Sequence, residues 1–186
     1  MAKLFYVMGA SGTGKDSVMN CAKSMLDGTH QVAFAHRYIT RIPDTTENHI
    51  YLTPKEFKLR EENRFFSLHW ESHGNFYGIG REINYWMSQG FSVVVNGSRA
   101  YLPVAIKKYK DLSPILIETN PEILLKRLTD RGREDLAEIE LRIKRNETFN
   151  ISERDIIRIA NNGPLNEAAH EFIRVITGVG KATPML

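Results

Sequence analysis

Apolar residues of this chain gather in short runs, of which the first is uninterrupted, and these runs are separated by stretches in which apolar residues recur every three or four positions. The runs occupy residues 4–8, 32–35, 91–95, 113–118 and 155–160. A continuous apolar run of this length is typical of a strand that a parallel sheet buries on both faces. The sequence therefore predicts five such strands.

The stretches between these runs predict helices. Helical spacing covers residues 17–26, 82–89, 121–129 and 165–176, and a longer amphipathic stretch covers about 136–148. Thr53 followed by Pro54 predicts a helix that runs through residues 55–58. Residues 38–52 are polar and predict irregular structure, whereas residues 65–80 are rich in aromatic residues and histidine. The alternation predicts an α/β fold with a five-stranded, mostly parallel sheet and helices on both faces.

Composition narrows the classes of function. The chain has 186 residues, of which 42% are hydrophobic and 25% charged, as expected for one globular domain. Its net charge of +3 is too small to argue for a nucleic acid partner. Cys21 is the only cysteine, so neither an intramolecular disulfide nor a cysteine metal cluster can form. We find no signal peptide and no apolar run of membrane-spanning length, and we expect a cytoplasmic protein whose oligomeric state is open.

The strongest chemical pattern follows the first predicted strand directly. Residues 9–17 are Gly9, Ala10, Ser11, Gly12, Thr13, Gly14, Lys15, Asp16 and Ser17. Glycines let backbone N–H groups turn toward a phosphate, a lysine reaches the β- and γ-phosphates, and the following helix adds the positive end of its dipole. The alternative is a glycine-rich turn with a chance lysine. The buried strand before the loop and the helix after it favour nucleotide binding.

Asp16 departs from the usual pattern, because serine or threonine normally follows the lysine. One interpretation makes Asp16 an oxygen ligand of Mg²⁺, directly or through water. A second has its charge stabilise the first helical turn, while Ser17 or water takes the metal. A third is a degenerate loop without catalysis, which the complete set of glycines and the lysine disfavours.

A series of short motifs follows the loop. They are Ile39-Thr40-Arg41, Glu47 and His49, Leu68-His69-Trp70, His73-Gly74, Tyr77-Gly78-Ile79, residues 94–100 with Leu102-Pro103, Arg127-Leu128, residues 131–134, and Arg142. Together with Gly14-Lys15-Asp16, this ordered series resembles the ribose 1,5-bisphosphate phosphokinase family, within the guanylate-kinase-like branch of P-loop kinases. The resemblance covers residues 4 to about 176. The chain departs from it at Thr45-Thr46, where a glycine pair is frequent, and at Gly80, where proline is usual.

The resemblance implies an enzyme of phosphonate breakdown that transfers the γ-phosphoryl group of ATP to ribose 1,5-bisphosphate, with Mg²⁺. The products would be 5-phospho-α-D-ribose 1-diphosphate and ADP. It also implies a core (1–35, 91–127 and 143–186), an acceptor-binding segment (36–90) and a lid (128–142). A guanylate kinase is the alternative among enzymes, although residues 35–43 keep only part of its acceptor motif. A non-catalytic interaction module is the other alternative, but such modules characteristically lose the lysine and the lid arginines.

The motifs also imply roles for particular residues. A phosphate acceptor is already anionic, so the obstacle is charge repulsion, which arginines and Mg²⁺ relieve. The resemblance implies catalytic roles for Lys15, Arg131 and Arg142, and ATP contacts for residues 9–17, Arg127 and Arg131. It implies contacts with the acceptor, a small phosphosugar, for Arg37, Arg41, Glu47, His49, His73, Tyr77, Asn96 and Arg99. The competing interpretations are solvated arginines, a polar turn at Glu47 and His49, and a core aromatic residue at Tyr77.

Overall fold

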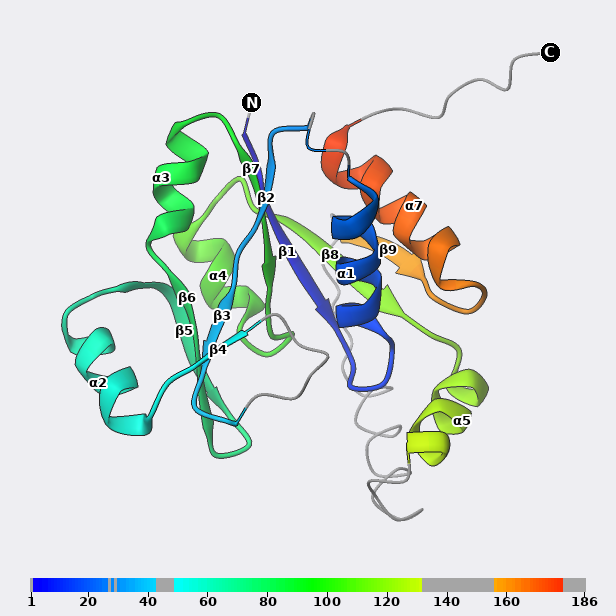
Figure 1. The fold of residues 1–186 in the computed structure, drawn as a ribbon, viewed down its shortest axis with the longest axis horizontal. Coiled ribbons are helices and arrows are strands. Elements are labelled where there is room, and N and C mark those ends of the chain that lie inside the picture. The colour runs from blue at the N-terminus through cyan, green and yellow to red at the C-terminus, as the bar shows by residue number, and fades with distance from the viewer. Residues whose placement is uncertain (1, 27, 29, 43–48, 132–155, 179–186) are drawn as a thin grey trace.

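The computed structural model describes residues 2–26, 28, 30–42, 49–131 and 156–178. Its central sheet has the strand order β2-β7-β1-β8-β9. In that order the strands are Val32–Phe34, Ser92–Asn96, Leu4–Gly9, Ser113–Glu118 and Ile157–Ala160. Every neighbouring pair in this sheet is parallel. The predicted α/β fold and its five-stranded parallel sheet are confirmed (Figure 1).

Helices cover both faces of the central sheet, and β1 is buried between them. Phe5 and Val7 pack with residues of α1 (Lys15–Met25) and α7 (Leu165–Thr177), which lie side by side on one face in Figure 1. Tyr6 and Met8 pack instead with residues of α3 (Glu82–Ser88) and α4 (Leu102–Lys108). Burial on two faces explains why the apolar run of β1 is continuous rather than alternating.

A second sheet lies between β2 and β7 in the sequence. Its strand order is β4-β3-β6-β5, formed by His49–Tyr51, Arg37–Ile39, Asn75–Gly80 and Phe66–Ser72. The β3–β4 pair is parallel, and the β3–β6 and β5–β6 pairs are antiparallel. Helix α2 (Pro54–Glu62) packs on this sheet through Phe57, whose ring stacks on Phe66 with centroids 4.6 Å apart. Leu68 and Ile79 belong to the core cluster on the α3 and α4 side of the central sheet.

Several local predictions are confirmed and others are wrong. Thr53 caps α2 as expected, its hydroxyl oxygen accepting the Glu56 amide at 3.2 Å, but the helix continues past residue 58 to Glu62. The irregular structure predicted for residues 38–52 is wrong near the two ends of that segment, because residues 38–39 belong to β3 and residues 49–51 form β4. Each has only three residues, too few to show a periodicity. Helix α4 had no counterpart in the prediction, and the helix predicted near 136–148 lies outside the described residues.

Helix α5 (Pro121–Arg131) follows β8 and lies close to the glycine loop, because Leu124 and Leu128 of α5 lie directly against Gly12. None of the helices in the described segments is long and apolar enough to cross a membrane.

Candidate functional site

The glycine loop joins β1 to α1 at the carboxyl end of the central sheet (Figure 1). Gly12 and Gly14 have φ angles of 91° and 79°, a left-handed backbone that side chains disfavour. A Cβ on Gly9 would lie 2.7 Å from the carbonyl oxygen of Ile117, and one on Gly12 would lie 2.8 Å from the Leu124 side chain. The loop therefore needs glycine for its conformation and for its close packing against β8 and α5.

Three side chains hold the carbonyl oxygen of Thr13. Asn161 Nδ2 donates to it at 2.8 Å, Thr119 Oγ1 at 3.2 Å and Arg127 Nη1 at 3.4 Å. The Thr13 hydroxyl donates to the carbonyl oxygen of Ala10 at 2.9 Å, which closes the loop from within. A carbonyl oxygen turned into a phosphate site would repel the anion, so these contacts favour the arrangement in which loop amides face the ligand.

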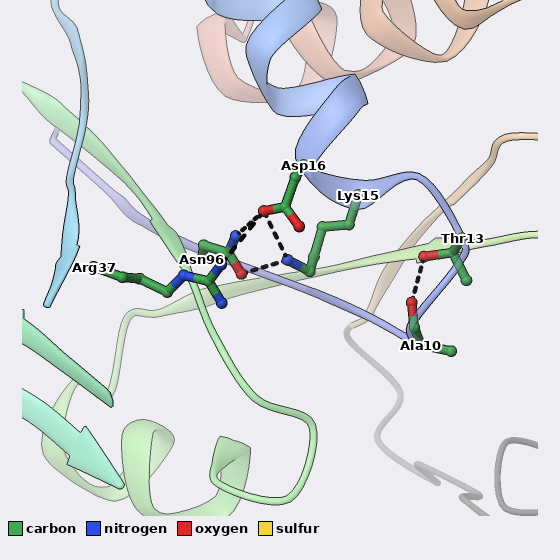
Figure 2. A network of polar contacts seen from close by, with 6 residues as sticks. All are labelled: Ala10, Thr13, Lys15, Asp16, Arg37 and Asn96. Atoms are coloured by element: carbon green, nitrogen blue, oxygen red, sulfur yellow. Dashed lines mark hydrogen bonds and ion pairs between the residues drawn. The ribbon is translucent and has the colours of Figure 1, made fainter. Parts of the chain in front are cut away.

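Four polar side chains converge at the first turn of α1 (Figure 2). Lys15 Nζ donates to Asn96 Oδ1 at 2.5 Å, and Asn96 Nδ2 donates to Asp16 Oδ1. Asp16 Oδ1 also lies 3.3 Å from Lys15 Nζ and 3.6 Å from Nη2 of Arg37. We call Lys15, Asp16, Arg37 and Asn96 the Asp16 cluster. It joins the glycine loop, the end of β7 and strand β3 of the second sheet.

Asp16 carries a negative charge at neutral pH. Burial alone would raise its pKa, but the charges of Lys15 and Arg37, with hydrogen bonds from Lys15 and Asn96, hold that pKa below its usual range. The ionised carboxylate of Asp16 and the hydroxyl of the exposed Ser17 are hard oxygen donors of the kind that Mg²⁺ prefers. These two residues therefore fit a magnesium ion. Within the described segments, no three or more His, Cys, Asp or Glu residues gather into a metal-binding group.

The loop that carries Arg99 is clamped to β1. A Cβ on Gly97 would lie 2.0 Å from Cζ of Tyr6, so the backbone passes directly across that ring. The buried Tyr6 hydroxyl donates to the carbonyl oxygen of Ser98 and accepts from its amide, each at 2.9 Å. Burial also lowers the pKa of Arg99, although a guanidinium stays protonated at neutral pH. Arg99 is thus partly buried on a loop of fixed path.

The second sheet brings two predicted acceptor residues together. The guanidinium carbon of Arg37 lies 5.9 Å from the centroid of the Tyr77 ring. This distance suits a cation–π contact, and Arg37 at the same time reaches Asp16. Tyr77 also stacks on Trp70 and is half-buried, and its contact with the acceptor stays a prediction.

The other predicted acceptor residues lie in different places. Arg41 is half-buried after β3, and His49 is half-buried on β4, opposite Arg37 in the parallel register. His73 occupies the exposed turn between β5 and β6, with a φ of 50°. Glu47 lies outside the described residues. The structure brings Arg37, Tyr77 and Asn96 to the Asp16 cluster or into contact with it. The acceptor role of each residue, these three included, stays a prediction.

The residues predicted to contact ATP also lie in different environments, and some of them are not described. Ser11 and Ser17 are exposed, Ala10 and Thr13 are buried, and Arg127 contacts the loop backbone and Thr119. Arg131 ends α5 and its side chain is not described, while Arg142 and residues 132–142 of the predicted lid lie outside the described part of the chain. The lid and the ATP contacts of Arg127 and Arg131 stay predictions.

Sequence reasoning missed Tyr6, Thr119 and Asn161. Thr119 and Asn161 directly follow β8 and β9, so both lie at the sheet edge where the glycine loop begins. Ligands of open parallel sheets bind at this edge, and a search of the residues after each predicted strand would have found both. Tyr6 has no such signal, because its hydroxyl is hidden within an apolar run.

The central sheet, the glycine loop and the second sheet define a guanylate-kinase-like P-loop kinase fold. The chain is similar to the crystal structure of guanylate kinase from Anaplasma phagocytophilum, with a TM-score of 0.71 over 98% of this chain and 88% of that one, at 18% identity. It is also similar to an unliganded sugar kinase from Janibacter sp. HTCC2649, with a TM-score of 0.53 over 97% and 96% of the two chains, at 15% identity. These likenesses concern the fold.

Sequence similarity to curated proteins shows the family to which this chain belongs. The ribose 1,5-bisphosphate phosphokinase PhnN of Desulfomicrobium baculatum is 51% identical over 177 residues, 95% of each chain. The proteins of the same name from Thiobacillus denitrificans and Burkholderia mallei are 47% and 41% identical, over 94% and 97% of this chain and 93% and 98% of theirs. A scan against protein-family models gives no match. The chain belongs to the ribose 1,5-bisphosphate phosphokinase family PhnN, which confirms the resemblance seen in the sequence and makes the protein a kinase.

Proposed function

We propose that this chain transfers the γ-phosphoryl group of ATP to ribose 1,5-bisphosphate, giving 5-phospho-α-D-ribose 1-diphosphate and ADP. The observation that carries the proposal is the convergence of Lys15 and Arg37 on Asp16, at 3.3 Å and 3.6 Å. One cation comes from the glycine loop and the other from the second sheet. A donor phosphate bound by the first and an acceptor phosphate bound by the second would lie next to each other.

Asn161 supports the nucleotide part of the proposal. Its side chain is 3% exposed, and its Oδ1 has no hydrogen-bond partner within the described part of the chain. A buried acceptor without a donor costs about 1–3 kcal/mol, which a ligand N–H group would recover. Because Asn161 Nδ2 holds the glycine loop at Thr13, such a ligand group would lie beside that loop.

Different residues would bind the phosphates of ATP, the metal ion and the phosphates of the acceptor. Lys15 and the loop amides would hold the β- and γ-phosphates, and Asp16 with Ser17 would hold Mg²⁺, which neutralises phosphate charge when it is bound. Arg37, Arg41 and Arg99 would hold the two acceptor phosphates. The attacking phosphate oxygen is already anionic, so these residues need to supply charge and alignment rather than a general base.

The proposal is tested by measuring ADP release with ribose 1,5-bisphosphate, GMP and ribose 5-phosphate as acceptors, and by detecting the new diphosphate by ³¹P NMR. We expect kcat/KM for ribose 1,5-bisphosphate to exceed that for GMP by at least about a thousandfold, because unpaired polar groups make such discrimination steep. Comparable turnover of GMP would favour a guanylate kinase. ATP binding without turnover of any acceptor would favour a non-catalytic module.

A further inference from the structure

Three aromatic rings form a row beside the Asp16 cluster. Trp70 on β5 and Tyr77 on β6 are direct partners in the antiparallel register, so their side chains lie on the same face of the second sheet. Their ring planes are within 3° of parallel, with centroids 5.6 Å apart. Tyr101, from the turn between β7 and α4, lies on Trp70 with centroids 5.4 Å apart and planes inclined by 30°. We call Tyr77, Trp70 and Tyr101 the aromatic row.

One end of the row contacts Arg37, and the other end lies on the loop that carries Arg99, both of which we assign to the acceptor. Arg37 contacts the Tyr77 ring and reaches Asp16, and this places the Tyr77 end beside the glycine loop. The Tyr101 end belongs to the short loop that carries Arg99, whose path is set by the Tyr6 hydroxyl. Trp70 is therefore the middle ring of a row that runs from Tyr77, which Arg37 contacts, to Tyr101, which lies two positions after Arg99 in the sequence.

The row is anchored on an apolar base. Trp70 and Tyr101 pack against the core cluster that includes Leu68 and Ile79, both fully buried. Leu68 lies two residues before Trp70 on β5, and Ile79 lies two residues after Tyr77 on β6, so all four residues belong to the same face of this sheet. At these four positions no amide or carboxylate side chain is available to hydrogen-bond the edge of a base.

A nucleobase is bound by proteins through stacking on an aromatic face and through hydrogen bonds to its edge. In the aromatic row Trp70 already stacks on both Tyr77 and Tyr101. We infer that Trp70 is a specificity-determining residue, whose indole takes the stacking surface between Arg37 and Arg99 and so excludes nucleotides as acceptors. An acceptor that presents phosphates and a sugar without a base does not need this surface.

The inference rests on the proposed function, and its test separates the two. Trp70→Leu removes the planar ring but keeps an apolar side chain on the core cluster, and Trp70→Ala removes both. Trp70→Phe keeps a ring in the row and is the matched control. Trp86→Phe is a second control, because Trp86 packs against the same core cluster and has no ring contact with the row among the described residues.

The quantity to measure is the ratio of kcat/KM for GMP to kcat/KM for ribose 1,5-bisphosphate. We expect this ratio to rise at least about tenfold in Trp70→Leu and Trp70→Ala, the scale of one base–aromatic stack, and to stay unchanged in both phenylalanine variants. Equilibrium binding of GMP should tighten in the same two variants. Should Trp70→Ala fail to fold, Trp70→Leu decides.

An unchanged ratio and unchanged GMP binding in Trp70→Leu, with normal melting temperature and ATP affinity, would overturn the inference and leave Trp70 as core packing. An equal fall in turnover of both acceptors would do the same. A wild-type enzyme that does not use ribose 1,5-bisphosphate would contradict the proposed function instead. In that case the equilibrium binding of GMP, compared between the wild type and the four variants, still tests whether Trp70 prevents a nucleobase from binding.

Discussion

The hydroxyl of Tyr6 holds both backbone groups of Ser98, 92 positions later in the chain, at 2.9 Å each. A side chain in the middle of the central strand β1 thereby sets the path of the loop that carries Arg99. The Tyr6 side chain is fully buried and Ser98 is half-buried, so water has limited access to the two hydrogen bonds.

Tyr6→Phe tests this relationship. Loss of the hydroxyl leaves the amide and the carbonyl of Ser98 without their partner, and we expect the free energy of unfolding to fall by about 1–3 kcal/mol. The KM for the acceptor should rise and the KM for ATP should not. Denaturant titration and steady-state kinetics measure both. Tyr109→Phe is the control, because its hydroxyl bond to Asn84 is exposed, and an equal loss there would contradict the prediction.

The same hydroxyl predicts a dependence of stability on pH. Burial raises the pKa of Tyr6 above its usual 10.0. A pKa that is higher in the folded state contributes stability that is complete below the unfolded pKa and is lost as pH rises toward the folded one. The difference in free energy of unfolding between wild type and Tyr6→Phe should therefore be constant below about pH 9 and shrink above about pH 10. A constant difference up to pH 11 would argue against it.

Lys15→Ala should keep the fold and lose most of the turnover, on the order of a hundredfold or more, because the γ-phosphate loses its cation. Single-turnover kinetics and a melting curve measure the two effects. Lys23→Ala removes a lysine from the last turn of the same helix and should leave kcat unchanged. Near-normal turnover of Lys15→Ala would mean that the glycine loop is not the catalytic phosphate site.

Asp16→Ala distinguishes a metal ligand from a helix-stabilising charge. If Asp16 holds Mg²⁺, the metal concentration for half-maximal rate should rise far more than the KM for ATP. If it only stabilises the start of α1, the free energy of unfolding should fall by about 0.3–1 kcal/mol with an unchanged metal titration. Ser17→Ala, titrated in parallel, tests the second proposed ligand.

Arg99→Ala should weaken the response to the acceptor and leave ATP binding intact. One charge-assisted contact to a phosphate contributes about 1.5–3 kcal/mol, so kcat/KM for the acceptor should fall about tenfold to a hundredfold. The control is Arg158→Ala, which removes an exposed ion pair with Glu118. A matching rise in the KM for ATP would place Arg99 at the donor instead.

The sequence predicted the central sheet well, because its inner strands are buried on both faces: in β7, Val94 packs in one core cluster and Val95 in the other. It did not predict the second sheet, whose pairing of Ile39 with Tyr77 joins distant segments and depends on no local signal. The glycine loop was evident from residue types alone. The contact of Arg37 with Asp16 was not, because it exists only once the two sheets are folded together.

The three donors on the Thr13 carbonyl lie 106, 114 and 148 positions away from it, on β8, α5 and β9 or just after them. The conformation of the glycine loop therefore depends on residues outside the loop. If residues 9–17 were grafted onto another α/β protein, the glycines and the lysine would arrive without the groups that orient the loop. Engineers who wish to transplant this loop would need to carry Thr119, Arg127 and Asn161 with it.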